Sequence, residues 1–199
     1  MKKIPGTVLA FLFLSGTGWA QNKSSVQPPT LAIHFFLNDF KGAANVRSSS
    51  LSTAIRTHQF GKLKDMTPGL AVNYIQGLSE HFDLTTSLGG SFLDYPFRNR
   101  GPFNKDAFLL EGDFSVRAKM VNNNYWISPY LQVGVGASKY KGYFGGFLPA
   151  GAGIQINIFE EAFILINTQY RIPITETTNY HFYHSVGLAG SIGRKKQTP

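Results

Sequence analysis

The chain has 199 residues, no cysteine, 15% charged residues, 14% aromatic residues and a net charge of +8. The lack of cysteine excludes disulfide frameworks, thiolate nucleophiles, thiolate metal sites and a lipidated N-terminal cysteine. The aromatic content excludes a disordered chain. A mean hydropathy of −0.09, with no long apolar run after the N-terminus, excludes a helical membrane protein but not a membrane β-barrel.

Residues 1–20 have the three parts of a secretory signal peptide. Lys2 and Lys3 form the positive start, residues 8–14 form the apolar core, and small residues precede a cleavage site expected after residue 20. Removing the two lysines leaves 17 basic and 11 acidic residues, a net charge of +6. Residues 21–29 are polar with two prolines, and we predict that they form a flexible lead-in.

From residue 30 onward, apolar and polar residues alternate with a period of two, as in β-strands that bury one face. In residues 108–120, for example, Phe, Leu, Val and Met side chains share one face, and Glu, Asp, Ser, Arg and Lys share the other. Eight segments follow this pattern: residues 31–38, 67–77, 82–91, 108–120, 127–139, 148–158, 164–172 and 180–192. We therefore predict an all-β chain of eight strands.

The connections between these strands alternate in length. Tight turns at residues 77–81, 121–124 and 159–161 separate long or glycine-rich connections at residues 39–66, 94–106, 139–147 and 173–179. Outer-membrane barrels have an even number of strands, short periplasmic turns and longer extracellular loops. Residues 30–192 are therefore predicted to form an eight-stranded antiparallel up-and-down transmembrane β-barrel.

The composition of the two strand faces favours a lipid-facing exterior. The polar face is rich in Gly, Ser, Asn and Gln, as a crowded lumen requires, whereas the apolar rows would promote aggregation in water. Aromatic residues near the strand ends resemble two interfacial girdles: Phe92, Tyr95, Tyr140, Tyr143, Tyr180 and Phe182 beside the loops, and Tyr125, Trp126 and Phe159 beside the turns. Alternation alone leaves open the inverse arrangement, an exported soluble barrel that binds an apolar ligand.

Three stretches carry a resemblance to a known family: residues 134–140, 157–162 and 180–190. With them, residues 30–192 resemble the N-terminal transmembrane domain of OmpA-family outer-membrane proteins, in the form common in Bacteroidota. The resemblance implies a multi-pass barrel in the bacterial outer membrane that acts as a membrane anchor and envelope-stabilising component.

The last strand also resembles that family, but the residues that follow it differ from the family pattern. The last strand is similar to the signal read by the barrel-assembly machinery, which is the partner expected during biogenesis, but it does not end the chain on an aromatic residue. Residues 193–199 follow instead as a polar tail or the start of a linker. In the family such a linker leads to a peptidoglycan-binding domain, so peptidoglycan is an expected partner only if a further C-terminal domain exists.

The predicted inner face carries equal numbers of acids and bases. We expect these residues to form a lumenal polar network: Asp83, Glu111, Asp113, Arg117, Lys119 and Arg171. An eight-stranded barrel is just wide enough for side chains to fill it, and confined charges must be paired or solvated. A salt-bridged plug is therefore the prediction, and a narrow small-solute pore is the alternative.

The five histidines do not point to an enzyme. His184 and Ser185 are neighbours on a strand, so their side chains face opposite sides and cannot easily form a base and nucleophile pair. His34 on the first strand could meet His181 or Ser185 inside the barrel, but no acyltransferase or deacylase pattern accompanies them. No histidine pair has metal-ligand spacing, and we expect no enzymatic activity, no cofactor and no metal.

The predicted loops are basic. Candidate contacts with the phosphates of lipopolysaccharide are Lys41, Arg47, Arg56, Lys62, Arg98, Arg100 and Lys141. A basic residue near an anionic membrane surface contributes about 1 kcal/mol; a solvated charged face is the alternative. Outer-membrane lipid and lipopolysaccharide are thus the expected partners, and nucleic acid is not. Residues 48–55 have the signals of a short helix, a candidate plug or partner contact.

Overall fold

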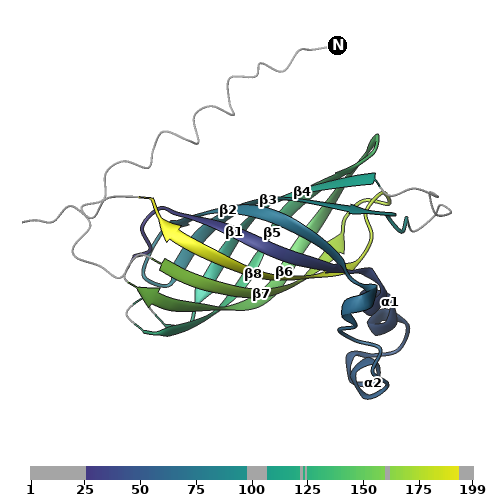
Figure 1. Cartoon of the computed structure of the whole chain (residues 1–199), viewed down its shortest axis with the longest axis horizontal. Coiled ribbons are helices and arrows are strands. Elements are labelled where there is room, and N and C mark those ends of the chain that lie inside the picture. Colours follow the sequence, from purple (N-terminus) through teal and green to yellow (C-terminus); the bar gives the residue numbers. More distant parts are fainter. Residues whose placement is uncertain (1–25, 98–106, 122, 124, 160–161, 193–199) are drawn as a thin grey trace, which may run out of the picture.

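The computed structural model describes residues 26–97, 107–121, 123, 125–159 and 162–192. The predicted signal peptide and the tail at residues 193–199 lie outside this part of the chain. Within it, eight strands form a closed antiparallel barrel in which each strand pairs with its sequence neighbours and the last pairs with the first (Figure 1). The strands are β1 Thr30–Asp39, β2 Thr67–Gly77, β3 Phe82–Leu93, β4 Ala107–Lys119, β5 Ile127–Tyr140, β6 Tyr143–Phe159, β7 Ala162–Pro173 and β8 His181–Ser191.

Alternation along the strands gives the barrel an apolar outside and a polar inside. Outward-facing Ile33, Val133 and Leu188 are 62%, 61% and 63% exposed, whereas inward-facing Asp83 and Arg117 are almost fully buried. The predicted face assignment is therefore confirmed. The chain does not form the inverse arrangement, in which an apolar interior would hold a ligand.

One predicted loop is wrong. The sequence predicts a glycine-rich connection over residues 139–147, but β5 and β6 are joined by Lys141 and Gly142 alone. Lys141 has the left-handed φ of 53° that this tight turn requires. Gly145 instead lies inside β6, where a Cβ would come within 2.1 Å of Thr178 Oγ1 in the β7–β8 connection. This glycine marks a close approach and not a loop.

Inside the barrel, large side chains face glycines across the strand pairs. Tyr130 on β5 lies opposite Gly153 on β6, and His34 on β1 lies opposite Gly187 on β8. A Cβ at Gly153 would lie 2.4 Å from the phenol of Tyr130. These glycines therefore provide the space that the buried rings occupy.

Replacing Gly153 by valine is expected to destabilise the barrel by about 1–3 kcal/mol, because overpacking forces neighbouring atoms to move. The new side chain would meet the Tyr130 ring and also the carbonyl oxygen of Ile166, 2.7 Å away. Gly190→Val is the matched control, since a Cβ there meets nothing within 4 Å. The measurement is the urea midpoint at which the compact, unboiled gel band disappears. Equal midpoints for the two variants would refute this packing role.

The two ends of the barrel differ, and Figure 1 shows the difference. At one end lie the start of β1, the end of β8, the connection at residues 78–81, the end of β4 and the end of β6; we call this the turn end. The opposite loop end carries helices α1 Phe40–Ser48 and α2 Leu51–Arg56 and the one-turn helix η2 Leu63–Asp65. In outer-membrane barrels the loop end is extracellular. No helix among the described residues has the length and apolar character needed to cross a membrane.

The last residues of the predicted flexible lead-in are held in place at the turn end. Gln27 is buried, its side-chain amide donates to Thr30 Oγ1 at 2.9 Å, and its carbonyl accepts from Gly77 N at 3.1 Å. Gln155 Nε2 donates to Gln27 Oε1 at 3.3 Å. Residues 26–29 therefore belong to the barrel end, because the Gln27 amide finds hydrogen-bond partners in the polar lumen.

Candidate functional site

One strand supplies most of the charges in the lumen. Successive residues of a strand point to opposite faces, so every second residue of β4 projects inward. This row contains two acids, a serine and two bases, all of them buried: Glu111, Asp113, Ser115, Arg117 and Lys119. Asp83 from β3 and Arg171 from β7 complete the six residues predicted for the lumenal network, and both are also buried.

The first of two charged clusters surrounds Arg171. Its Nη1 atom lies 2.7 Å from Glu111 Oε2, and its Nη2 atom lies 3.4 Å from Asp113 Oδ2. The guanidinium also lies 3.9 Å from the centre of the Tyr183 ring, a cation–π distance. His181 Nε2 approaches the other oxygen of Glu111 at 3.4 Å. These five residues, the Arg171 cluster, link β4, β7 and β8 across the lumen.

The second cluster lies nearer the turn end and centres on Lys119. Its Nζ atom contacts Asp83 Oδ1 at 3.0 Å and Asn123 Oδ1 at 3.0 Å. Arg117 donates from Nε to Gln132 Oε1 at 3.2 Å, and its guanidinium lies 4.7 Å from the Tyr130 ring centre. Lys119 and Arg171 thus pair with acids of the predicted set at two levels of the barrel, whereas Arg117 contacts an amide and an aromatic ring. Such paired side chains fill space that a solute would need.

The loop end of the lumen is covered by an aromatic lid. Tyr95 and Tyr140 are buried there; Tyr140 donates to the carbonyl of Leu93 at 3.1 Å, and Tyr95 Oη accepts from Asn179 N at 2.8 Å. Phe40 packs edge-on against Tyr95 at a centroid distance of 5.4 Å. The girdle prediction is therefore wrong for these two tyrosines. Position 140 continues the inward row of β5, a sequence signal that could have placed it correctly.

Other predicted girdle residues do face outward. Phe92 beside the loops is 70% exposed, and Tyr125 and Trp126 beside the turns are 60% and 69% exposed. Aromatic side chains at these two levels are typical of the membrane–water interfaces of a barrel.

The structure separates His184 from Ser185, as the sequence pattern predicts. Ser185 points inward and is buried, whereas His184 points outward and stacks on Phe182 at a centroid distance of 5.9 Å. His181 contacts Glu111, and His34 fits into the space left by Gly187. Among the described residues, no group of three His, Asp or Glu side chains is placed to hold a metal ion.

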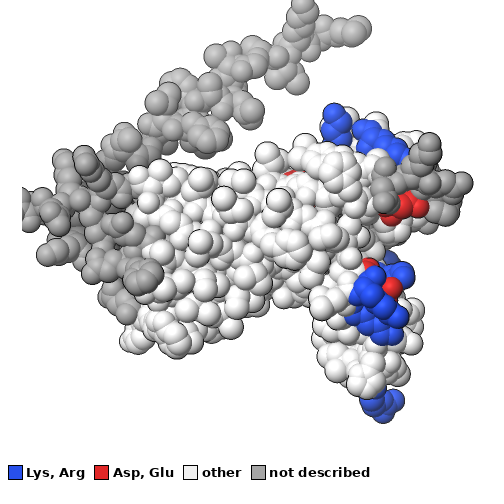
Figure 2. Space-filling model, in the orientation of Figure 1, with Lys and Arg blue, Asp and Glu red and all other residues white. Residues whose placement is uncertain are grey.

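The basic residues of the first loop lie at the loop end, away from the uncharged wall of the barrel (Figure 2). Lys41 Nζ contacts Asp65 Oδ1 at 2.7 Å, and this hydrogen bond lowers the pKa of the Asp65 carboxyl. Arg47 lies 3.7 Å above the Tyr180 ring, and Arg56 and Lys62 are exposed. The structure therefore gathers four of the predicted lipid-contacting residues in one loop. Arg98 and Arg100 lie outside the described residues.

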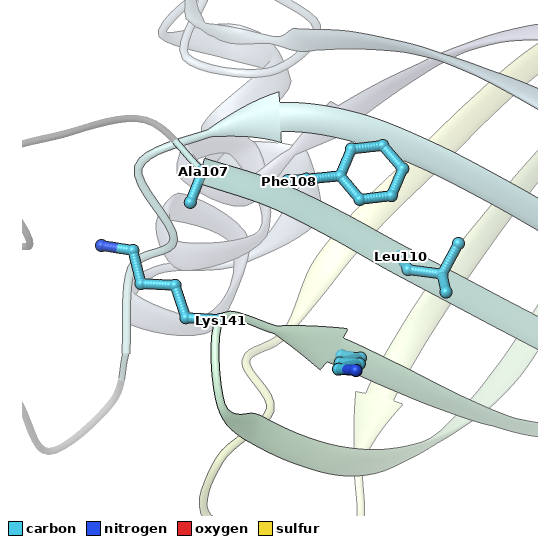
Figure 3. Close-up of a pocket in the computed structure, with 5 residues that line it drawn as sticks. Ala107, Phe108, Leu110 and Lys141 are labelled. Atoms are coloured by element: carbon cyan, nitrogen blue, oxygen red, sulfur yellow. The ribbon is translucent and has the colours of Figure 1, made fainter.

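The remaining predicted lipid-contacting residue, Lys141, borders an open depression on the outer wall between β4 and β5. The depression has a volume of about 330 Å³ and is lined by Ala107, Phe108, Leu110, Lys139 and Lys141. Figure 3 shows Phe108 and Leu110 on β4 and Lys141 at the neighbouring turn.

Comparison with solved structures shows the same architecture in other proteins. Neisserial surface protein A has a TM-score of 0.57 and 8% sequence identity, over 84% of this chain and 99% of that one. The chain has the fold of the eight-stranded outer-membrane barrels. The N-terminal β-barrel domain of Pseudomonas aeruginosa OprF also matches, with a TM-score of 0.53, 9% identity and coverage of 81% and 96%. No protein-family model and no curated protein matches the sequence.

This transmembrane barrel agrees with the predicted fold class and with the resemblance to OmpA-family domains at the level of the fold. The likeness to these structures lies in the fold and not in the residues, since the identities are 9% and 8%. An outward apolar row and an inward polar row can be built from many residue combinations, so the pattern persists when the individual residues do not.

Proposed function

We propose that the chain is a structural barrel of the outer membrane, a membrane anchor and envelope-stabilising component whose lumen is closed. The observation that carries this proposal is the filling of the lumen. The Arg171 cluster and the Lys119–Asp83 pair occupy its interior, the Tyr95–Tyr140 lid covers one end, and Gln27 lies at the other. This arrangement supports a plug over the narrow-pore alternative.

We further propose that the loop end contacts the phosphates of lipopolysaccharide. The first loop offers Lys41, Arg47, Arg56 and Lys62, and Lys141 adds an amine beside an apolar depression on the lipid-facing wall. Anionic headgroups at the membrane surface attract such residues. The barrel-assembly machinery stays an expected partner during biogenesis, and peptidoglycan stays conditional on a further domain.

The test is heat-modifiability combined with conductance. The chain beginning at Gln21 is expected to migrate as a compact, fast band when unboiled and as a slower band after boiling, because closed barrels resist detergent. In a planar lipid bilayer the folded protein is expected to conduct no more than the lipid alone. Boiled protein is the control for leakage caused by denatured chains. Stepwise conductance by the folded barrel would overturn the closed lumen, and a water-soluble protein without the gel shift would overturn the anchor.

A further inference from the structure

Only the start of the first loop reaches the lumen, where Phe40 packs against Tyr95 of the lid. The rest of the loop lies beside the barrel wall. Figure 1 shows α1 and α2 extending sideways from the loop end. Phe60 packs edge-on against outward-facing Phe182 at a centroid distance of 5.2 Å, and Arg47 lies on Tyr180. The expectation that residues 48–55 form a plug is therefore wrong. We call residues 40–66 the lateral arm.

Contacts with the barrel wall fix the depth at which the arm would lie relative to the lipid headgroups. Phe182 and Tyr180 stack with Tyr170 at centroid distances of 4.9 and 5.9 Å, an aromatic group at the loop end of β7 and β8. Aromatic groups at strand ends lie among lipid headgroups. An arm that leaves the wall sideways from this level runs along the membrane surface and not away from it.

The arm has its small side chains inside and its large apolar ones outside. Ala43 and Ala54 are fully buried where the two helices meet, whereas Leu51, Ile55 and Leu63 are 49%, 55% and 73% exposed. Leu51 and Ile55 are four residues apart in α2 and so share one helix face. A contiguous exposed apolar face such as that of Leu51 and Ile55 is typical of an interaction surface, and Leu63 in η2 is a further exposed aliphatic side chain of the arm. The barrel wall, with which the arm is continuous, likewise exposes its large apolar side chains, and there they face lipid.

The charge of the arm indicates which surface would cover these side chains. Residues 40–66 contain five basic residues and one acid, and the acid Asp65 is paired with Lys41. The exposed bases match an anionic lipid layer, and basic amphipathic segments bind such layers by combining charge attraction with apolar burial.

We infer that the lateral arm is a membrane-surface anchor, in which Leu51, Ile55 and Leu63 insert into the outer leaflet while the basic residues contact lipid phosphates. The apolar face of such a segment lies roughly 5–10 Å into the boundary between headgroups and acyl chains. This inference deepens the proposed lipid contact, on which it rests for the sign of the lipid charge. The arm would hold the loop end level with the membrane surface.

The experiment places a fluorescent side chain on the exposed apolar face of the arm. In the chain beginning at Gln21, with Trp126→Phe as background, Ile55→Trp is compared with Glu176→Trp, an exposed position in the β7–β8 connection. Each variant is placed as a single copy in nanodiscs of phosphatidylcholine with brominated acyl chains, with and without lipid A. Heat-modifiability shows separately that each barrel is folded.

Ile55→Trp is expected to emit at a shorter wavelength and to be quenched several-fold more strongly than Glu176→Trp, because bromine quenches only nearby indoles. Lipid A should strengthen this quenching. Equal, water-like emission from both positions in folded barrels would overturn the inference and leave the barrel proposal intact. Shielding that appears only in discs holding two barrels would also overturn it, by assigning the surface to a second copy. Quenching that lipid A does not change would support insertion and count against the phosphate contact.

Discussion

Val133→Lys is expected to block or strongly reduce membrane assembly. Val133 lies midway along β5, is 61% exposed on the outer wall, and pairs with Val116 and Ala150 on the neighbouring strands. A lysine at the bilayer midplane of a barrel costs about 2–4 kcal/mol, since its charge loses hydration without gaining a partner. The measurement is the fraction of protein that forms the compact unboiled band in vesicles and in the outer-membrane fraction.

Ile127→Lys is the matched control for this prediction. Ile127 lies on the same strand and the same outward face, 41% exposed at its turn end, about 20 Å along the strand from Val133. The penalty for lysine falls to about 0–1 kcal/mol near the interface. Normal assembly of Ile127→Lys together with failure of Val133→Lys would show that Val133 lies in the hydrocarbon core and that Ile127 lies near the interface. Equal assembly of both would contradict the placement of this wall in hydrocarbon.

The fold could be predicted because its decisive features are local in sequence. A strand such as residues 108–120 shows its two faces in consecutive residues, and loop lengths are read directly between strands. Composition then indicates which face meets lipid, as the exposure of Val133 and the burial of Arg117 bear out. The one misplaced loop, at residues 139–147, shows the weakness of this reasoning. A glycine such as Gly145 that provides space for a distant side chain looks the same in sequence as one that turns the chain.

The candidate site was harder to predict because its contacts join distant residues. Alternation places Lys119 and Asp83 on the inner face, but only closure of the barrel with its register brings them to 3.0 Å across 36 residues. The lid depends on how the connection after β3 folds back toward Asn179. The direction of the lateral arm depends on Phe60 meeting Phe182, a contact with no local sequence signal.

Removing Arg171 is expected to destabilise the barrel strongly from the inside. Arg171→Ala would leave Glu111 and Asp113 buried without the guanidinium that lies 2.7 and 3.4 Å from their oxygens, and would also remove a contact with the Tyr183 ring. Breaking a buried ion pair by deleting one partner costs about 3–5 kcal/mol, because an uncompensated charge stays in the interior. The measurement is the shift in the urea midpoint of the compact band.

A variant that neutralises the whole set separates lost charge balance from lost packing. In Arg171→Met with Glu111→Gln and Asp113→Asn, the side chains keep similar volumes and no buried charge is left unpaired among the three. Replacing a complete ion cluster by neutral groups is often close to neutral in stability. The triple variant is therefore expected to recover most of the stability lost by Arg171→Ala. If it were as unstable as Arg171→Ala, the cluster would stabilise the barrel through shape and hydrogen bonds and not through charge pairing.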